Sequence, residues 1–391
     1  MDLDLIQSTL RQNGLDGWLF YDHHRRDPIA YRVLKIDPPM CTRRWFYLIP
    51  AEGDPSKLIH RVERHNLDGL PGHEIEYSTW TEQHEGLKSI LNGKKRIAMQ
   101  YSPLNNIPYV GLVDAGTIEL VRSLGVEVIT SADLVQLFEA RWSEDALASH
   151  LEAGEVVHAA VRAGFAAIRD AVRSGKGISE YDVQQEMRRV FDAGGVITDE
   201  GPVAAVNRNS ANPHYMPERE KSASIGANDF VLLDVWGKMN RPGAVYFDIT
   251  WTGFVGTEIP RRFADVFEIV KEARDAAVDF VQSAMTSGRT IHGYEVDDVA
   301  RQVVTRRGYG PNFVHRTGHS IGEDVHANGA NIDNFETRDT RPIIPGICFS
   351  IEPGIYLEEF GVRSEVNMFV GPASARVTGE VQAAIVPILV Y

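Results

Sequence analysis

In the first third of the chain, segments with hydrophobic positions at helical spacing alternate with segments at strand-like spacing. Short apolar runs bounded by turn-forming residues are typical of buried strands, whereas apolar residues three and four apart indicate amphipathic helices. This pattern predicts helices over residues 2–13 and 106–125, and strands over 17–21, 44–50, 57–62, 95–100 and 126–129. The alternation favours a layered α/β unit that spans residues 1–140.

A long amphipathic helix is predicted to open a second unit, residues 141–391. Ser143 is followed by Glu144 and Asp145. This order is typical of a helix N-terminus, because the serine caps free N–H groups and the acids favour the positive end of the helix dipole. Apolar residues then recur at helical spacing from Leu147 to Val172. The helix is expected to end at the SGKG segment.

An internal repeat follows this helix. Residues 174–183 read SGKGISEYDV and residues 287–296 read SGRTIHGYEV, so five of ten positions match at an offset of 113 residues. In both places one predicted helix precedes the motif and another follows it. Such a duplication predicts two halves related by pseudo-symmetry.

Two acid-bearing hairpins are predicted at equivalent places in the halves. Asp234 and Asp248 lie in β-rich runs around a turn-forming centre, so a hairpin would set them roughly opposite each other. Glu352 and Glu365 repeat this arrangement. Like charges on paired strands repel and lose hydration when buried, so four converging carboxylates predict a bound cation. Oxygen ligands with one imidazole suit Mn²⁺ or a related divalent ion. The alternative is that the acids face water at sheet edges.

Histidines cluster between the two hairpins and just before the first. Residues 314–327 read VHRTGHSIGEDVHA and contain His315, His319 and His326, while His214 lies in the segment NSANPHYMP. A single histidine is more often structural than catalytic. Three within twelve residues of a glycine-bearing segment predict a functional loop.

Composition and charge narrow the class of protein. A chain of 391 residues exceeds the usual size of one core, and a net charge of −14 argues against non-specific nucleic-acid binding. Two cysteines do not indicate a disulfide framework and favour a reducing compartment. No signal-peptide pattern opens the chain and no apolar run approaches 18 residues, so a cytoplasmic protein that does not enter a membrane is expected.

From about residue 140 onward these motifs resemble the pita-bread metallopeptidases, the family of methionine aminopeptidase, aminopeptidase P, prolidase and creatinase. Length and the N-terminal segment resemble the branch with aminopeptidase P, prolidase and creatinase. The resemblance implies an α+β protein with a creatinase-like α/β domain, residues 1–140, and a pseudo-symmetric pita-bread catalytic domain, residues 141–391. It also implies that the first domain shapes substrate access and dimer contacts, and hence a homodimer.

Five metal ligands of the family have matching residues here. They are an Asp in an apolar strand, an Asp before Ile-Thr, a His in Gly-His-x-x-Gly, a Glu before Pro-Gly and a Glu after Arg-x, namely Asp234, Asp248, His319, Glu352 and Glu365. The resemblance implies a dinuclear centre of two divalent ions, with Mn²⁺ expected and Co²⁺ or Zn²⁺ as alternatives. Asp234 would hold one ion, His319 and Glu352 the other, and Asp248 and Glu365 would bridge them.

The resemblance also implies roles in catalysis. A bridging water of lowered pKa would attack the scissile carbonyl, with Glu352 as proton acceptor. His214 and His326 match histidines that stabilise the tetrahedral intermediate. His315 and Arg363 match positions that contact substrate or support the ligands, and Arg363 is expected to orient the carboxylate two residues further on.

The sequence departs from the family pattern around the expected pocket. An insertion around MNRPG lengthens the interval between Asp234 and Asp248, and Trp251, Ser320 and Ala327 stand where Arg, Gly and an acid are common. No ligand is lost, but a strict requirement for proline stays open.

The expected function is that of a metal-dependent peptidase. Its substrates would be Xaa-Pro dipeptides, or longer Xaa-Pro peptides from which the N-terminal residue is removed. Two alternatives are a creatinase-like amidohydrolase of a small non-peptide amide and a non-catalytic peptide-binding module. Creatinase-type members typically lack the metal ligands and binding modules usually lose them, so the complete set of five counts against both.

Overall fold

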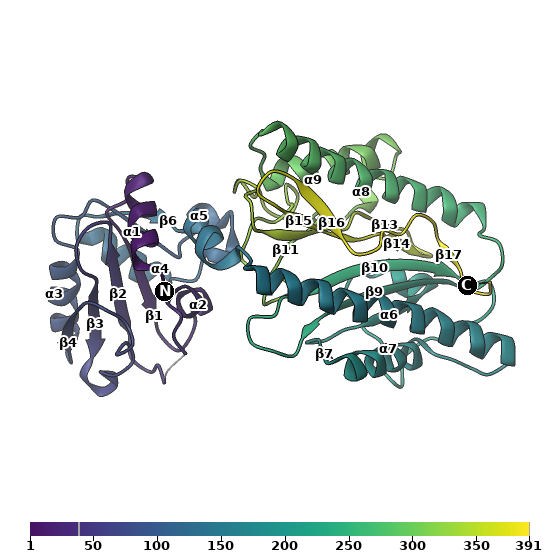
Figure 1. The fold of residues 1–391 in the computed structure, drawn as a ribbon, viewed down its shortest axis with the longest axis horizontal. Coiled ribbons are helices and arrows are strands. Elements are labelled where there is room, and N and C mark those ends of the chain that lie inside the picture. The colour runs from purple at the N-terminus through teal and green to yellow at the C-terminus, as the bar shows by residue number, and fades with distance from the viewer. Residues whose placement is uncertain (38–39, 391) are drawn as a thin grey trace. The chain divides into compact units, whose positions relative to one another are not determined.

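The polypeptide divides into two units, Met1–Glu139 and Ala140–Tyr391, in the computed structural model, which describes residues 1–37 and 40–390 (Figure 1). None of the described helices has the length and apolar character needed to cross a membrane. The elements of unit 1 are α1 (Leu3–Gln12), β1 (Gly17–Asp22), α2 (Pro28–Leu34), β2 (Trp45–Pro50), β3 (Ser56–His60), β4 (His73–Tyr77), α3 (Trp80–Ile90), β5 (Arg96–Met99), α4 (Ala115–Ser123), β6 (Glu127–Thr130) and α5 (Ala132–Val135). Short 3₁₀ turns and a π turn at Gln136–Ala140 complete it.

Unit 1 is built on a six-stranded mixed sheet in the order β4-β3-β2-β1-β5-β6, counted over the described residues. Successive side chains of a strand point to opposite faces, so the apolar run of β1 fills two cores. Trp18 packs in one core with residues of α1 and α2, and Leu19 packs in the other with residues of α3 and α4. The layered α/β arrangement that the sequence predicts is therefore present.

The predicted strands and the first helix of unit 1 are confirmed to within two residues. The helix predicted over 106–125 is wrong in its first half. A 3₁₀ turn at Pro108–Val110 stands there, and α4 starts only after Asp114, whose side chain caps it. Proline fixes φ and lacks the N–H that a helix interior needs, so the helix cannot run through this segment.

Unit 2 consists of two pairs of helices around several sheets. Its elements are α6 (Glu144–Ser174), α7 (Glu180–Gly194), β7 (Val196–Ile197), β8 (Val203–Val206), η5 (Asn207–Ala211), β9 (Phe230–Met239), β10 (Phe247–Phe254), α8 (Arg261–Ser287), α9 (Gly293–Arg306), η6 (Gly310–Asn312), β11 (Ser320–Ile321), β12 (Cys348–Ile351), β13 (Gly354–Tyr356), β14 (Gly361–Arg363), β15 (Val366–Val370), β16 (Ala375–Thr378) and β17 (Val386–Pro387). In Figure 1, α6 and α7 lie on one side of β9 and β10, and α8 and α9 lie on the other.

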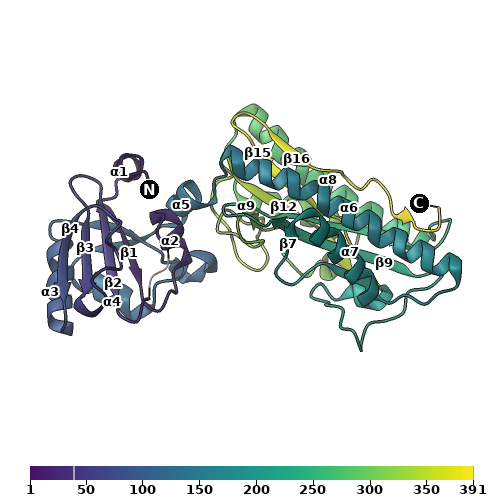
Figure 2. The same ribbon diagram turned by 60° about the horizontal axis from the view of Figure 1, so that its bottom comes forward.

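The internal repeat is visible in the fold. α6 ends at Gly175 (φ 67°) and α8 ends at Gly288 (φ 69°), and both glycines have the left-handed conformation that favours this residue at a helix end. A shorter helix follows each time. α6 and α7 share one apolar core with β9 and β10, and α8 and α9 share another with β12 and β15. The neighbouring runs of α6 and α7 are seen again in Figure 2.

The registers of the two hairpins differ in one respect from the prediction. β9 and β10 pair antiparallel with Asp234 opposite Thr250 and Asp248 opposite Trp236. The two acids are therefore diagonal neighbours on one face rather than directly opposite. In the second hairpin, β12 with β15 and β13 with β14 share one register, which sets Glu352 across from Glu365 as predicted.

Asp27, the buried N-cap residue of α2, provides a test of the stability of unit 1. Burial raises the pKa of Asp27 from 3.8 to about 7, and the charge of Asp22 adds to the rise. The folded state then keeps a proton that the unfolded chain loses, so the free energy of unfolding should fall between about pH 4 and 7. Asp27→Asn should remove this decrease in the free energy of unfolding, which is on the order of a few kcal/mol. Urea unfolding at pH 4.5 and 8 measures it.

A matched control is available for this substitution. Asp2 caps α1 in the same way but is exposed, so Asp2→Asn should leave the pH dependence of unfolding unchanged. Equal pH dependence in the wild type and in Asp27→Asn would contradict the assignment of the slope to Asp27.

Candidate metal centre

Three predicted ligands from both halves meet inside unit 2. Asp248 on β10, His319 just before β11 and Glu365 just before β15 are all buried, and each offers a ligand atom within 4.8 Å of the other two. Among the described residues this is the one group of acids, histidines or cysteines that is close enough to hold a metal ion. Residues up to 117 positions apart in the sequence are thus brought to one point.

The other two predicted ligands lie against this group. His319 Nε2 is 3.5 Å from Asp248 Oδ2 and 3.4 Å from Glu352 Oε1. The Thr250 hydroxyl lies 3.1 Å from Asp234 Oδ1 and 2.8 Å from Glu365 Oε2. The structure therefore brings all five predicted ligands into one cluster.

The electrostatics of the cluster are those of crowded, dehydrated acids. Burial raises the pKa values of Asp248 and Glu365 well above their ordinary range, and the neighbouring carboxylates raise them further. Burial lowers the pKa of His319, so its ring is neutral and keeps a lone pair that can bind a metal. A divalent cation would stabilise the ionised form of the acids.

Two buried atoms support the fit of a cation. Asp248 Oδ1 and Glu365 Oε1 have no hydrogen-bond partner among the described residues. A buried polar atom without a partner costs about 1–3 kcal/mol, and more when it is charged. Carboxylate oxygens with one neutral imidazole are also the donors that divalent ions such as Mn²⁺ accept. The residues present therefore fit a metal centre.

Arg363 and His315 are linked beside the cluster. Arg363 binds the Asp234 carboxylate and donates to the hydroxyls of Thr250 (2.8 Å) and Tyr356 (3.2 Å). His315 Nε2 lies 2.8 Å from the same Tyr356 hydroxyl. Arg363 thus binds Asp234 directly, and it reaches Glu365, the carboxylate that it is expected to orient, through the Thr250 hydroxyl. Burial lowers the pKa of His315 to about 3, and the charge of Arg363 acts in the same direction.

The other two predicted histidines lie at the edge of the cluster. The rings of His326 and His319 meet edge to face, with centroids 4.3 Å apart. The pKa of His326 is lowered to about 2, first because two adjacent imidazoles, His326 and His319, would repel each other if both were protonated, then by burial, with smaller contributions from Arg316 and His214. His214 is exposed, follows η5, and is close enough for its charge to act on His326.

Several polar residues of the site escape the motif analysis. Ser350 accepts a hydrogen bond from the backbone N–H of His319 (2.9 Å) and donates one to Glu352 (3.1 Å). Asn367 accepts from the Asp248 N–H (3.0 Å), and Thr250 bridges two acids. Each of the three lies two residues from a predicted acid along the chain. Side chains two apart share a face of a strand, so this spacing is a signal that sequence reasoning could have used.

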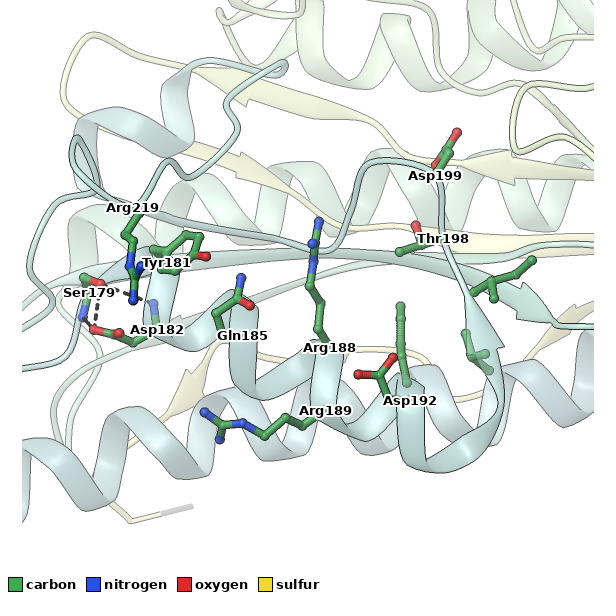
Figure 3. Close-up of a pocket in the computed structure, with 13 residues that line it drawn as sticks. Ser179, Tyr181, Asp182, Gln185, Arg188, Arg189, Asp192, Thr198, Asp199 and Arg219 are labelled. Atoms are coloured by element: carbon green, nitrogen blue, oxygen red, sulfur yellow. Dashed lines mark hydrogen bonds between the residues drawn. The ribbon is translucent and has the colours of Figure 1, made fainter.

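Two hollows of the surface lie away from the cluster. One of about 870 Å³ runs along α7 and is lined by residues such as Asp182, Arg188 and Arg219 (Figure 3). Another of about 1140 Å³ lies in unit 1. None of the predicted site residues lines either hollow. The functional assignment therefore rests on the chemistry of the cluster and not on cavity size.

Comparison with known proteins identifies the family. Residues 148–372 match the sequence profile of Metallopeptidase family M24. The chain belongs to this family. It is 33% identical over 376 residues to a Xaa-Pro dipeptidase of Lactobacillus delbrueckii subsp. lactis, with 93% of each chain covered.

Two solved structures share the fold over nearly the whole chain. Dipeptidase PepE from Mycobacterium ulcerans has a TM-score of 0.73 at 22% identity, covering 98% of this chain and 96% of that one. A prolidase from Pyrococcus horikoshii OT3 has a TM-score of 0.65 at 22% identity, covering 97% and 98%. These matches confirm the predicted α+β fold, and family membership makes this M24 protein a metallopeptidase.

Thr250 provides a test of the cluster as a metal centre. Thr250→Val keeps the shape of the side chain but removes the hydroxyl that contacts Asp234, Glu365 and Arg363. We expect a loss of about 10- to 100-fold in Mn²⁺ affinity, because partners that orient metal ligands typically contribute this much. Isothermal titration calorimetry of the metal-depleted protein measures it.

Thr252→Val is the matched control. Thr252 lies on the same strand and is equally buried, but its hydroxyl contacts Gln382. Its substitution should leave Mn²⁺ affinity within about twofold, since losing a contact away from the acids changes no ligand. Equal losses of affinity in both variants would show that Thr250 acts only on packing.

Proposed function

We propose that this protein is a metal-dependent peptidase that hydrolyses Xaa-Pro dipeptides or removes the N-terminal residue of short Xaa-Pro peptides. The observation that carries the proposal is the convergence of Asp234, Asp248, His319, Glu352 and Glu365 on one buried point. Its nearly full-length similarity to a Xaa-Pro dipeptidase supports the substrate class.

In this proposal the cluster holds two divalent ions, Mn²⁺ in the first place and Co²⁺ or Zn²⁺ as alternatives. Asp234 would bind one ion, His319 and Glu352 the other, and Asp248 and Glu365 both. Ions held there would activate a water molecule for attack and polarise the scissile carbonyl. The unpartnered oxygens of Asp248 and Glu365 support a bridging role for these two acids.

The chain's own groups then handle protons and charge. Glu352 is proposed to accept a proton, and its Oε1 is oriented by the Ser350 hydroxyl at 3.1 Å. His326 and His214 are proposed to donate hydrogen bonds to the oxygen that becomes negative as the carbonyl is attacked. The low pKa of His326 keeps its ring neutral, so it donates an N–H without releasing a proton. Arg363 would hold the Asp234 carboxylate in place. His315 would orient the Tyr356 hydroxyl, which accepts a hydrogen bond from Arg363.

We further propose a cytoplasmic homodimer that acts on short peptides. In this proposal residues 1–140 would shape substrate access and dimer contacts. A screen of Xaa-Pro dipeptides, Xaa-Pro-Xaa tripeptides and creatine, with Mn²⁺, Co²⁺, Zn²⁺ and a chelator, tests the substrate class. Release of proline from a dipeptide in the presence of metal would support the proposal. Turnover of creatine alone would favour an amidohydrolase. Turnover of none of these substrates would favour a binding module.

The two acids assigned as bridges should affect both metal binding and hydrolysis. We expect Asp248→Ala or Glu365→Ala to abolish dipeptide hydrolysis and to lower the number of bound ions from two towards zero, because each carboxylate would contact both ions. Metal content by elemental analysis, alongside a proline-release assay, measures this. Unchanged metal stoichiometry would refute the bridging assignment.

The histidines at the edge should affect turnover alone. His214→Ala and His326→Ala should each lower kcat by about 10²-fold or more, since they would act on charge that develops in the transition state. Metal content should stay at the wild-type value. If either variant loses metal, that histidine is a ligand and its proposed role is wrong.

A further inference from the structure

Each half of unit 2 contains a fully buried acid near the start of its second helix. Glu180 is the first residue of α7, and Asp297 lies one turn further along α9. A buried carboxylate is costly unless hydrogen bonds or opposite charges satisfy its oxygens. The partners of these two acids therefore show what each of them stabilises.

Glu180 holds together the segment that carries His214. Its carboxylate accepts hydrogen bonds from Val206 N (2.7 Å), Asn209 Nδ2 (2.9 Å), the Tyr215 hydroxyl (2.5 Å) and Ala223 N (2.8 Å). The Glu180 N–H also donates to Ala223 O at 3.1 Å. One side chain thus joins the beginning, the middle and the end of residues 206–223. Hydrogen bonds to this segment therefore satisfy both oxygens of the Glu180 carboxylate.

Asp297 does the same for the segment with His315 and His319. It accepts hydrogen bonds from Thr317 N (3.0 Å), the Thr317 hydroxyl (2.5 Å) and Asn334 N (2.9 Å), and it pairs with Arg301 (3.2 Å). Arg301 in turn donates to the backbone oxygen of His315 at 2.7 Å. Thr317 O accepts the N–H of Glu352 at 2.7 Å, so this network also reaches a proposed ligand.

The two acids perform this task from different positions of the repeat. At the offset of 113 residues Glu180 corresponds to Gly293, where a Cβ atom would lie 1.9 Å from Asn331 O. A side chain is therefore excluded there, because the loop backbone occupies its place. Asp297 corresponds to Gln184, which is itself buried and donates to Pro202 O at 2.8 Å. In both halves, then, a buried polar side chain of the second helix is bonded to the loop that follows.

We propose that Glu180 and Asp297 are positioning residues, which hold the histidine-bearing segments 206–223 and 313–321 in the geometry that hydrolysis requires. Their catalytic effect rests on the proposed function, but their structural effect does not. Neither acid belongs to the five-residue cluster. Loss of Glu180 should therefore displace His214 and no ligand, whereas loss of Asp297 should displace His315 together with the ligand His319. A displacement of about 1 Å can lower a rate by about 10²-fold.

Hydrogen exchange with mass spectrometry tests the structural part without any assay of activity. Glu180→Ala should speed amide exchange in peptides covering 206–223 and leave 313–321 unchanged, and Asp297→Ala should do the reverse. The N-terminus of α7 should persist in Glu180→Ala, since Ser179 and Asp182 cap it independently through bonds of 2.7–3.2 Å (Figure 3). Glu186→Ala on α7 and Glu268→Ala on α8 are matched controls, because each pairs with a cation on its own helix.

Kinetics with a Xaa-Pro dipeptide test the catalytic part. Glu180→Ala should lower kcat by about 10-fold or more at wild-type metal content. Asp297→Ala should lower kcat at least as much and should also weaken metal binding, because segment 313–321 carries His319. The two controls should match the wild type. Glu180→Gln keeps one acceptor oxygen and should recover part of the loss. It also keeps the proposal testable if the alanine variant does not fold.

The outcomes separate this inference from the proposed function. Unchanged exchange in both segments, or equal acceleration throughout unit 2, would overturn the positioning role. Segment-specific exchange with a wild-type protein that cleaves no Xaa-Pro peptide would refute the proposed function and leave the structural role in place. Loss of bound metal in Glu180→Ala would also overturn the inference, because segment 206–223 contains no proposed ligand and the acid would then support the ligands themselves.

Discussion

The repulsion among buried carboxylates is the constraint on which the architecture of unit 2 depends. Asp248 and Glu365 come from different halves, yet both are buried beside each other and beside two further acids. Without a compensating charge such a group is costly. The fold therefore surrounds it with neutral donors and one cation: the Thr250 hydroxyl, the neutral ring of His319, and Arg363 on Asp234. Protons or a bound cation must neutralise the remaining negative charge, and a divalent ion would do so with the acids ionised, which links the fold to metal binding.

The pseudo-symmetry of unit 2 produces this geometry from two similar halves. Each half contributes one hairpin with two acids on one face, and a helix pair that packs behind it. Bringing the two hairpins together creates a site that neither half could form by itself. The segments with histidines are mostly irregular and are held by hydrogen bonds to buried acids, and the second of them is also paired to β12 through β11.

Sequence patterns predict those parts of the molecule that periodicity controls. The helix from Ser143, its end at Gly175, and the position of Glu352 across from Glu365 all follow from spacing and turn residues. The diagonal placement of Asp234 and Asp248 could not be predicted, because the register of a hairpin depends on the conformation of its turn, which the sequence pattern does not specify. The contact of Arg363 with Asp234 joins residues 129 positions apart, and no local pattern carries that information.

The repeat also shows why matching motifs miss some functional residues. SGKGISEYDV and SGRTIHGYEV agree at positions that set helix ends and core packing, and these are fixed by backbone conformation and volume. They disagree at Glu180, where the other half has Gly293 because the loop backbone lies 1.9 Å from a would-be Cβ. The role of Glu180 is instead taken one turn later by Asp297. Two halves can thus keep a function while exchanging the residue that performs it, so contacts rather than aligned letters reveal the correspondence.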